Sequence, residues 1–320
     1  MVPESRRPAV GTDALAAWCA RWLGAAPAAE LFEAGYLSTV KGLRLTDGRE
    51  VVVKVRPYGP RLAGCSVVHR TLWTAGFPCP EPLVDVQPMD DYAATAEMLM
   101  ADVDDPPPHD ELAALSAAAL ARLVELAPNP DSVPSLAPSP SWAGWDHTEP
   151  GLWPAPEDRD VDLNAHREPR WLDRVAEAVR DLLRRHAGDP VIGHGDWHPE
   201  NLRWHGRHLN AVHDWDSVIC QPEPAIAGLA AASFLGLGDE QGMVASVEDS
   251  AAFLDAYQQA CSCRWTSADV SACWAAGLWQ RTFDAKTQSL NGDPEQILTR
   301  PEAQVRLRLA GLNPDLAADA

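Results

Sequence analysis

The sequence predicts an α+β protein of two lobes, a small β-rich lobe over residues 1–100 and a larger, mainly helical lobe over residues 101–320. Apolar and polar side chains alternate over residues 31–56, as they do in strands with one buried face. After residue 108, apolar side chains recur mostly at helical spacing. Between the two patterns lies ADVDDPPP, an acidic and proline-rich stretch that is typical of a connection between lobes.

The first lobe is expected to contain two helices and a small sheet. Residues 12–24 have amphipathic helical spacing, with Thr12 or Asp13 near the start of the helix and Gly24 at its end. The dipeptide Asp47-Gly48 favours the tight turn of a β-hairpin. The remaining elements are a helix over 62–75 that stops at Gly76 and strands over 83–87 and 92–100.

The second lobe is expected to contain six helices, with one short β-rich piece over 191–218. The helices are predicted over 110–127, 171–187, 224–237, 249–261, 267–290 and 301–311. Residues 128–165 form an irregular insert with several tryptophans and carboxylates. Two interpretations of this insert are open. Its tryptophans and carboxylates bind an ammonium-bearing ligand, or the insert is a solvated acidic loop.

Composition narrows the class of protein. The formal net charge of −20 disfavours nucleic acid and anionic membranes as partners, since both attract basic surfaces, and it is compatible with a cationic small molecule. The sequence shows neither an apolar run long enough to cross a bilayer nor a signal-peptide pattern, which predicts a cytoplasmic protein. The seven cysteines lack framework spacing, so we expect reduced thiols, with Cys261 and Cys263 at a helix end. The oligomeric state, monomer or homodimer, is left open.

One segment concentrates side chains that are suited to phosphoryl transfer. This reaction needs a carboxylate beside the acceptor hydroxyl and hard oxygen ligands that hold magnesium against the phosphates. Asp196 suits the first role, while Asn201 and Asp214 suit the second. Pro199 keeps the segment out of a helix interior, so we expect a shaped loop. The alternative is a set of turn-forming residues without chemistry. The pattern consists of His194, Gly195, Asp196 and Asn201, followed after a predicted strand pair by Asp214, Trp215 and Asp216.

The motifs HGDWHPEN and HDWD resemble, in type and spacing, the signature of the aminoglycoside phosphotransferase and choline kinase family, which is related to the protein kinases. The resemblance covers most of the chain, including Lys54 in VVVKV and the segment GFPCPEPL. It implies a bilobal protein-kinase-like fold that transfers the γ-phosphate of ATP to a small hydroxylated molecule. The acceptor is then an aminoglycoside or other antibiotic, an amino alcohol or a sugar. An antibiotic acceptor would imply a role in antibiotic resistance.

The same resemblance implies a role for each matching residue. Asp196 resembles the catalytic base, Asn201 and Asp214 resemble the Mg²⁺ ligands, and Asp216 resembles a second acid of the metal-binding element. The residues expected to support the catalytic loop are His194, Trp197 and His198, with Trp197 either lining the acceptor site or packing inward. The residues expected to contact ATP are Lys54, Gly35, Ser38, Glu97, Met98 and Met100.

Two positions depart from the family pattern. Cys65 stands where kinase-like folds place the glutamate that pairs with the strand lysine, so Lys54 is expected to use another partner, such as Glu81, or none. Gly228 stands where family members commonly have an aspartate that braces the catalytic loop. These departures motivate a second hypothesis, a nucleotide-binding pseudokinase of the same fold.

Other chemistries are disfavoured by missing motifs. The sequence lacks G-x-x-x-x-G-K-[ST] and G-x-S-x-G, which argues against P-loop and serine-hydrolase sites. The histidines of 194–213 lack the H-E-x-x-H spacing of a zinc site, so His194 is interpreted as a brace for the loop. A protein kinase is disfavoured because no Ala-Pro-Glu follows Asp214.

Overall fold

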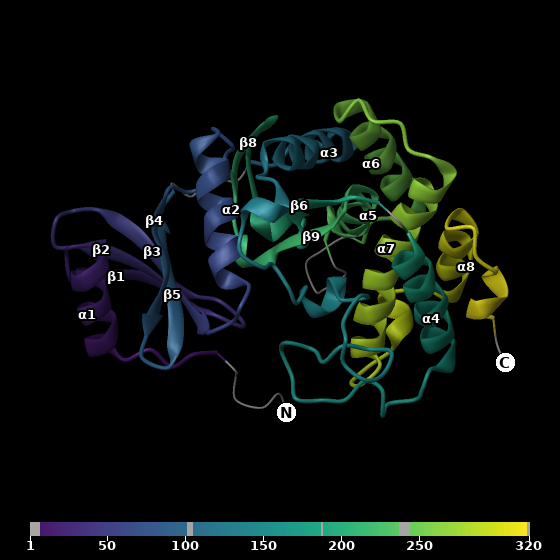
Figure 1. The fold of residues 1–320 in the computed structure, drawn as a ribbon, viewed down its shortest axis with the longest axis horizontal. Helices are drawn as coiled ribbons and strands as arrows, with labels where there is room; N and C mark the ends of the chain where they lie inside the picture. Colours follow the sequence, from purple (N-terminus) through teal and green to yellow (C-terminus); the bar gives the residue numbers. More distant parts are fainter. Residues whose placement is uncertain (1–6, 101–104, 187, 237–243, 319–320) are drawn as a thin grey trace.

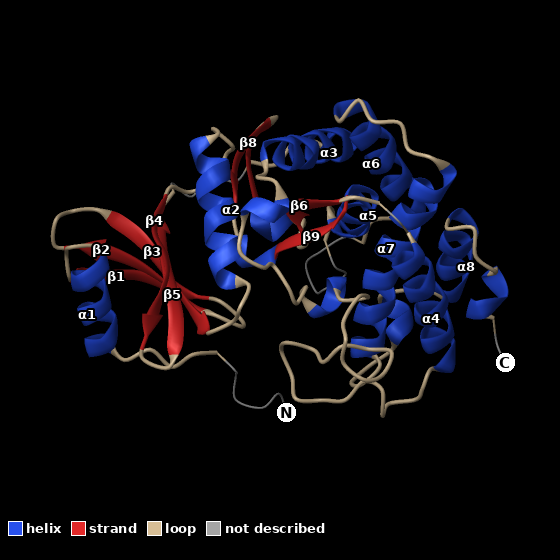
Figure 2. Cartoon of the chain, in the orientation of Figure 1, coloured by secondary structure: helices blue, strands red, loops and turns tan. Residues whose placement is uncertain are grey.

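The structure is a computed structural model that describes residues 7–100, 105–186, 188–236 and 244–318. A twisted sheet with one helix on its outer face lies at one end of the molecule, and a group of helices lies at the other (Figure 1). Besides the five-stranded sheet there are two short strand pairs, which lie near the centre of the molecule (Figure 2). The predicted α+β, two-part architecture is confirmed. Residues 101–104 of the predicted connection lie outside the described residues.

The N-terminal sheet has five antiparallel strands in the order β1-β2-β3-β5-β4. In β3 every second residue is buried, so Val53 and its neighbours on that face join the core formed with α1, while Lys54 faces the opposite side. The predicted turn at Asp47-Gly48 joins β2 to β3, and Gly48 has the positive φ of 88° that such a turn favours. The elements are α1 (Thr12–Trp22), β1 (Pro27–Ala34), β2 (Thr39–Leu45), β3 (Glu50–Pro57), β4 (Pro82–Met89) and β5 (Tyr92–Met98).

The first helix begins as predicted but is capped differently. Its N-cap is Gly11, which makes no side-chain hydrogen bond, and Thr12 is the first helical residue. The helix ends at Trp22, and Gly24 follows with a φ of 77°. Asp13 therefore lies in the first turn, where a carboxylate interacts favourably with the helix dipole.

Helix α2 (Leu62–Thr74) lies between the sheet and the C-terminal helices (Figure 1). Its buried residues Cys65, Val68 and Leu72 belong to the large hydrophobic cluster of the C-terminal part, not to the cluster beneath the sheet. The division of the chain at residue 100 stays a prediction, but by packing α2 belongs with the second part. Periodicity predicts the helix without revealing which core its apolar face joins.

The six predicted helices of the C-terminal part are confirmed. They are α3 (His109–Leu126), α4 (Arg170–Arg185), α5 (Glu223–Ser233), α6 (Val247–Ala260), α7 (Ser267–Gln288) and α8 (Arg300–Leu309). Within the described ranges, none of the helices combines the length and apolarity needed to cross a membrane.

Glycines let α5 and α7 approach closely. A Cβ atom on Gly228 would lie 2.0 Å from the backbone oxygen of Cys273, and one on Gly277 would lie 2.7 Å from the backbone oxygen of Gly228. No side chain fits at position 228, because the space in which it would stand is filled by the backbone of α7. The aspartate that the family resemblance leads one to expect at this position would therefore collide with α7.

Two short strand pairs bring the halves of the HGD–DWD pattern together. In the first, β6 (Pro190–His194) pairs antiparallel with β9 (Val218–Pro222), so His194 lies opposite Val218. In the second, β7 (Leu202–His205) and β8 (His208–Val212) form the predicted hairpin. The residues after β6 and the residues before β9 consequently meet at one edge.

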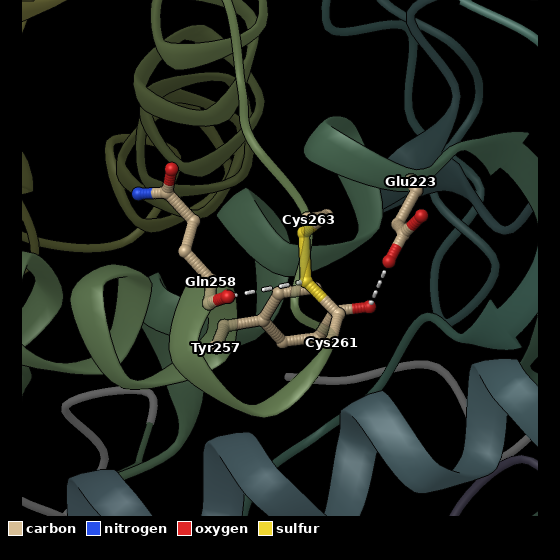
Figure 3. The surroundings of a disulfide bond; sticks show 5 residues. All are labelled: Glu223, Tyr257, Gln258, Cys261 and Cys263. Atoms are coloured by element: carbon tan, nitrogen blue, oxygen red, sulfur yellow. Dashed lines mark hydrogen bonds between the residues drawn. A yellow bond between two sulfur atoms is a disulfide. The ribbon is translucent and has the colours of Figure 1, made fainter.

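One cysteine prediction is wrong. Cys261 and Cys263 form a disulfide at the end of α6, beside the hydroxyl of Tyr257, which donates to Glu223 at 2.9 Å (Figure 3). The intervening Ser262 has a φ of 53°, and this left-handed turn places both sulfur atoms together. The sequence spacing carries no signal for that turn. The free cysteines are Cys19, Cys65, Cys79, Cys220 and Cys273.

Candidate active site

The residues after β6 form a loop, 194–201, that we call the HGD loop. His194 is fully buried and braces the loop at two points. Its Nδ1 accepts the backbone N–H of Asp196 at 3.2 Å, so Nε2 carries the proton and donates to the backbone oxygen of His213 at 3.0 Å. Burial lowers the pKa of His194, which keeps this neutral tautomer in place. The predicted bracing role of His194 has this geometric basis.

Asp196 is held by two side chains of its own loop. Its Oδ2 accepts from Nδ2 of Asn201 at 2.9 Å and from Nε2 of His198 at 3.2 Å. Burial by itself would raise the pKa of Asp196, but the hydrogen bond and charge of His198, with His194 and Asn201, bring it below its usual range. Asp196 is therefore ionised at neutral pH and fixed in orientation.

Trp197 packs inward. It is fully buried, and its indole Nε1 donates to the hydroxyl of Ser116 at 2.8 Å. The structure thus decides between the two positions that the sequence left open, and Trp197 supports the loop from below instead of lining an acceptor site.

Two further hydrogen bonds brace the HGD loop from outside it. The indole Nε1 of Trp142 donates to the backbone oxygen of Gly195 at 2.8 Å, and the hydroxyl of Ser233 donates to the backbone oxygen of Trp197 at 3.3 Å. Sequence reasoning missed these braces. They come from the insert and from α5, and no sequence spacing links them to the HGD loop.

Asp214 enters the site in a left-handed backbone conformation, with φ 62° and ψ 51°. Aspartate tolerates this conformation better than most residues do. Its Oδ2 accepts from the hydroxyl of Ser217 at 2.8 Å, and its Oδ1 pairs with Nζ of Lys54. Burial opposes ionisation, but Lys54 outweighs it and holds the pKa of Asp214 well below its usual range.

Lys54 has acidic partners, and Glu81 is not among them. Its Nζ pairs with Asp214 and lies 2.5 Å from Oδ1 of Asp216. Burial would lower the pKa of Lys54, but these two carboxylates raise it above its usual value. The lysine is therefore charged and is held between the sheet and the DWD segment.

A cleft of about 1120 Å³ opens between the sheet and the HGD–DWD edge. Among the residues expected to contact ATP, those that line the cleft are Lys54, Gly35, Glu97, Met98 and Met100. Ser38 is buried and is not one of the lining residues. Across the cleft, Glu97 Oε1 lies 3.9 Å from Nδ1 of His213, a contact between the two parts of the molecule.

The oxygen donors at the cleft fit a hard divalent cation. Asn201 and Asp214 both line it, and the amide nitrogen of Asn201 is engaged by Asp196, which leaves its amide oxygen as the atom available to a metal. Amide and carboxylate oxygens are the ligands that Mg²⁺ prefers. Among the described residues, Glu223, Cys261 and Cys263 also lie close together, but the two sulfur atoms form a disulfide and are not thiolate ligands.

The tryptophans of the insert are structural. Trp145 and Trp153 are buried in the core, and Trp153 packs against Trp279 with ring centroids 5.6 Å apart. Their ring faces are therefore not offered to a cationic ligand. One carboxylate of the insert makes a contact between the two parts of the molecule. Asp158 accepts a hydrogen bond from the hydroxyl of Tyr36 at 3.2 Å, which links the insert to the β1–β2 loop.

Asp284 on α7 is a further carboxyl group near the site that the sequence did not reveal. Its Oδ2 is buried and has no hydrogen-bond partner among the residues that the structure describes. Burial raises the pKa of Asp284 to about 7, with Arg281 opposing the rise and the charge of Asp196 adding to it. The carboxyl therefore carries a proton over much of the range below neutral pH.

Asp284→Asn is expected to stabilise the protein more at pH 8 than at pH 5. Between about pH 4, where the unfolded chain releases this proton, and about pH 7, the folded state binds more protons, so stability falls as pH rises. The variant does not lose this stability. The difference in free energy of unfolding between the variant and the parent should therefore increase by on the order of 2 kcal/mol from pH 5 to pH 8. Urea unfolding at both pH values measures it, with exposed Asp255→Asn as the control. A gain that is equal at both pH values would contradict the expectation.

Fold and site together define a two-lobed, kinase-like protein, with a lysine-bearing sheet and a carboxylate-rich loop facing one cleft. Residues 28–260 match the sequence profile of the phosphotransferase enzyme family. This match spans more than half of the chain, and the chain therefore belongs to that family. It is an enzyme of the small-molecule phosphotransferase class. No curated protein sequence matches the chain significantly.

Solved structures share the fold at low sequence identity. An amicoumacin kinase in complex with AMP-PNP, Ca²⁺ and Ami is 12% identical with a TM-score of 0.60, and the alignment covers 90% of this chain and 87% of that one. Spectinomycin phosphotransferase in complex with ADP and spectinomycin is 13% identical, with a TM-score of 0.56 and coverage of 97% and 98%. An ethanolamine kinase from Plasmodium vivax is 12% identical, with a TM-score of 0.53 and coverage of 87% and 81%.

Proposed function

We propose that this enzyme transfers the γ-phosphoryl group of ATP to a hydroxyl group of a small molecule, with Mg²⁺ as cofactor. The observation that carries the proposal is that Asn201 and the Lys54–Asp214 pair line the interlobe cleft, with Asp196 hydrogen-bonded to Asn201 directly behind them. Phosphoryl transfer uses an oriented carboxylate beside the acceptor, hard oxygen donors for the metal and a cation at the phosphates.

Asp196 orients the acceptor. Its carboxylate is ionised and fixed, so it accepts a hydrogen bond from the acceptor hydroxyl and takes up the proton as the new oxygen–phosphorus bond forms. The bond between the γ-phosphorus and the bridging oxygen of ATP breaks, and ADP leaves with that oxygen. Positioning and charge neutralisation supply most of the rate effect in this chemistry.

ATP is proposed to bind along the cleft between the sheet and the HGD–DWD edge. Lys54 would neutralise phosphate oxygens, Gly35 would let the β1–β2 loop approach them, and Glu97 to Met100 would face the adenine. Asn201 and Asp214 would hold Mg²⁺, which neutralises charge on the phosphates when it is bound. The nucleotides in two structurally similar kinases, AMP-PNP and ADP, support this assignment.

The acceptor is proposed to be a small hydroxylated molecule, among them aminoglycosides, other antibiotics, amino alcohols and sugars. Structural neighbours are named for amicoumacin, spectinomycin and ethanolamine. The net charge of −20 favours acceptors that carry an amine. An antibiotic acceptor would make the enzyme a resistance factor, and we propose a cytoplasmic location for it.

An ADP-release screen tests the proposal. The purified enzyme is incubated with Mg-ATP and panels of aminoglycosides, other antibiotics, amino alcohols and sugars, and mass spectrometry identifies any phosphorylated acceptor. We expect acceptor-dependent ADP release for at least one panel. Binding of Mg-ATP without turnover on every panel would instead favour the pseudokinase hypothesis, which Cys65 and Gly228 motivate.

A further inference from the structure

We propose that Asp216 is the positioning residue for Lys54, in place of a glutamate on α2, and is not a ligand of the metal. The inference rests on the proposed function, since it concerns how Lys54 meets the phosphates of ATP. It also assigns different roles to the two aspartates of the DWD segment.

Two cations project from one face of β3 toward the DWD segment. Lys54 and Arg56 are two residues apart on the strand, so their side chains point to the same side, and both line the cleft. The opposite face of the strand, with Val53 and Val55, is buried in the core beneath the sheet. The alternation of β3 therefore presents a pair of positive charges at fixed spacing.

Asp216 lies between these two cations. Its Oδ1 is 2.5 Å from Nζ of Lys54, and its Oδ2 pairs with the guanidinium of Arg56. Each oxygen of the carboxylate is thus matched by a cation from the sheet, which leaves it poorly suited to a divalent metal. Charge-assisted contacts of this kind also fix side-chain orientation.

Asp214 has a different set of partners. Besides Lys54, its partner is the neutral hydroxyl of Ser217, which donates to Oδ2 of Asp214 at 2.8 Å. The backbone N–H of His213, the residue before Asp214, donates to the backbone oxygen of Asn201 at 2.9 Å, which places Asp214 beside the other proposed metal ligand. The metal is therefore assigned to Asp214, and the positioning of Lys54, which contacts both aspartates, is assigned to Asp216.

Helix α2 cannot supply the acid, and its packing explains why. The helix sequence LAGCSVVHRTLWT contains no carboxylate, and Sγ of Cys65 lies 3.9 Å from the backbone oxygen of Asp216. The helix is fixed to the DWD segment by other contacts. The ring of His69 stacks on Trp215 with centroids 4.9 Å apart, and the guanidinium of Arg61 donates to the backbone oxygen of Val218. The acid that anchors Lys54 thus comes from the segment against which α2 is packed.

The decisive test is a double-mutant cycle on nucleotide binding, with a fluorescent ATP analogue titrated at several Mg²⁺ concentrations. Asp216→Asn should weaken Mg-nucleotide binding about 10-fold while leaving the Mg²⁺ concentration for half-maximal binding unchanged. Lys54→Ala should itself weaken Mg-nucleotide binding and raise the apparent KM for ATP. In that background, Asp216→Asn should weaken binding by less than a further factor of about 2, because Asp216 acts through the lysine. Asp214→Asn should instead raise the Mg²⁺ requirement.

A relocated carboxylate provides a second arm. Cys65→Glu combined with Asp216→Asn should recover most of the lost affinity, because it places an acid on the α2 side of Lys54; Cys65→Asp is the smaller alternative. An increased Mg²⁺ requirement for Asp216→Asn, or effects that multiply with those of Lys54→Ala, would overturn the proposal. If the parent enzyme binds no Mg-ATP, the proposed function fails instead, so the two failures are distinguishable.

Discussion

Asp196→Ala is expected to lower turnover by about 10²–10⁴-fold while leaving Mg-ATP affinity nearly unchanged. Asp196 is ionised and held by His198 and Asn201, and it is not among the residues that line the nucleotide cleft. Its loss should therefore remove the group that orients the acceptor hydroxyl without disturbing the nucleotide. Steady-state kinetics with the acceptor found in the ADP-release screen, together with nucleotide titration, measures both quantities.

The matched control for Asp196→Ala is Asp189→Ala, which removes an exposed carboxylate just before β6. It should leave turnover unchanged. Asp196→Asn adds information, because it keeps the size of the side chain and removes its charge. Turnover in Asp196→Ala equal to that of the parent would refute the role of Asp196.

Gly228→Ala is expected to lower the free energy of unfolding by at least about 2 kcal/mol. The added Cβ would lie 2.0 Å from the backbone oxygen of Cys273, and backbone cannot rotate away as a side chain can. Alanine would improve the helix propensity of α5 by about 1 kcal/mol, which is less than the cost of separating two packed helices. Gly228→Asp, which restores the common family residue, should be more damaging still.

Urea unfolding measures this effect, and Gly59→Ala is the control. A Cβ at Gly59 meets nothing within 4 Å, so that variant should unfold near the midpoint of the parent. If Gly228→Asp had the stability of the parent and a higher activity, the lack of an aspartate at position 228 would limit the activity of the enzyme. The interpretation that α7 leaves no room for a side chain at position 228 would then be wrong.

Much of the fold and the centre of the candidate site were predictable from local sequence. Strand alternation in β3 and helical spacing in α2 to α8 depend on residues close in the chain, so the sequence reveals them directly. The HGD and DWD motifs likewise carry their own spacing, and the hairpin between them returns Asp214 to the edge where Asp196 lies. Arg56 was also within reach, because it follows Lys54 at the period of a strand.

The remaining features depend on contacts between residues far apart in the chain. The departures from the family pattern at Cys65 and Gly228 suggested an impaired enzyme. In the structure, however, Cys65 packs against the backbone of Asp216, and Gly228 packs against the backbone of α7. The disulfide at Cys261 depends on the left-handed turn at Ser262, and the pKa of Asp284 depends on burial near Asp196. None of these has a local sequence signal.

By itself, the sequence determined the two-part α+β architecture, the phosphotransferase motifs and the choice of Asp196 as the candidate catalytic residue. Only the tertiary structure decided which carboxylates pair with Lys54, which groups brace the HGD loop and why a side chain at position 228 would collide with α7. The physical reason is that secondary structure and motif spacing arise from neighbours along the chain. Charge pairing, burial and helix contact instead depend on surfaces that meet only after folding.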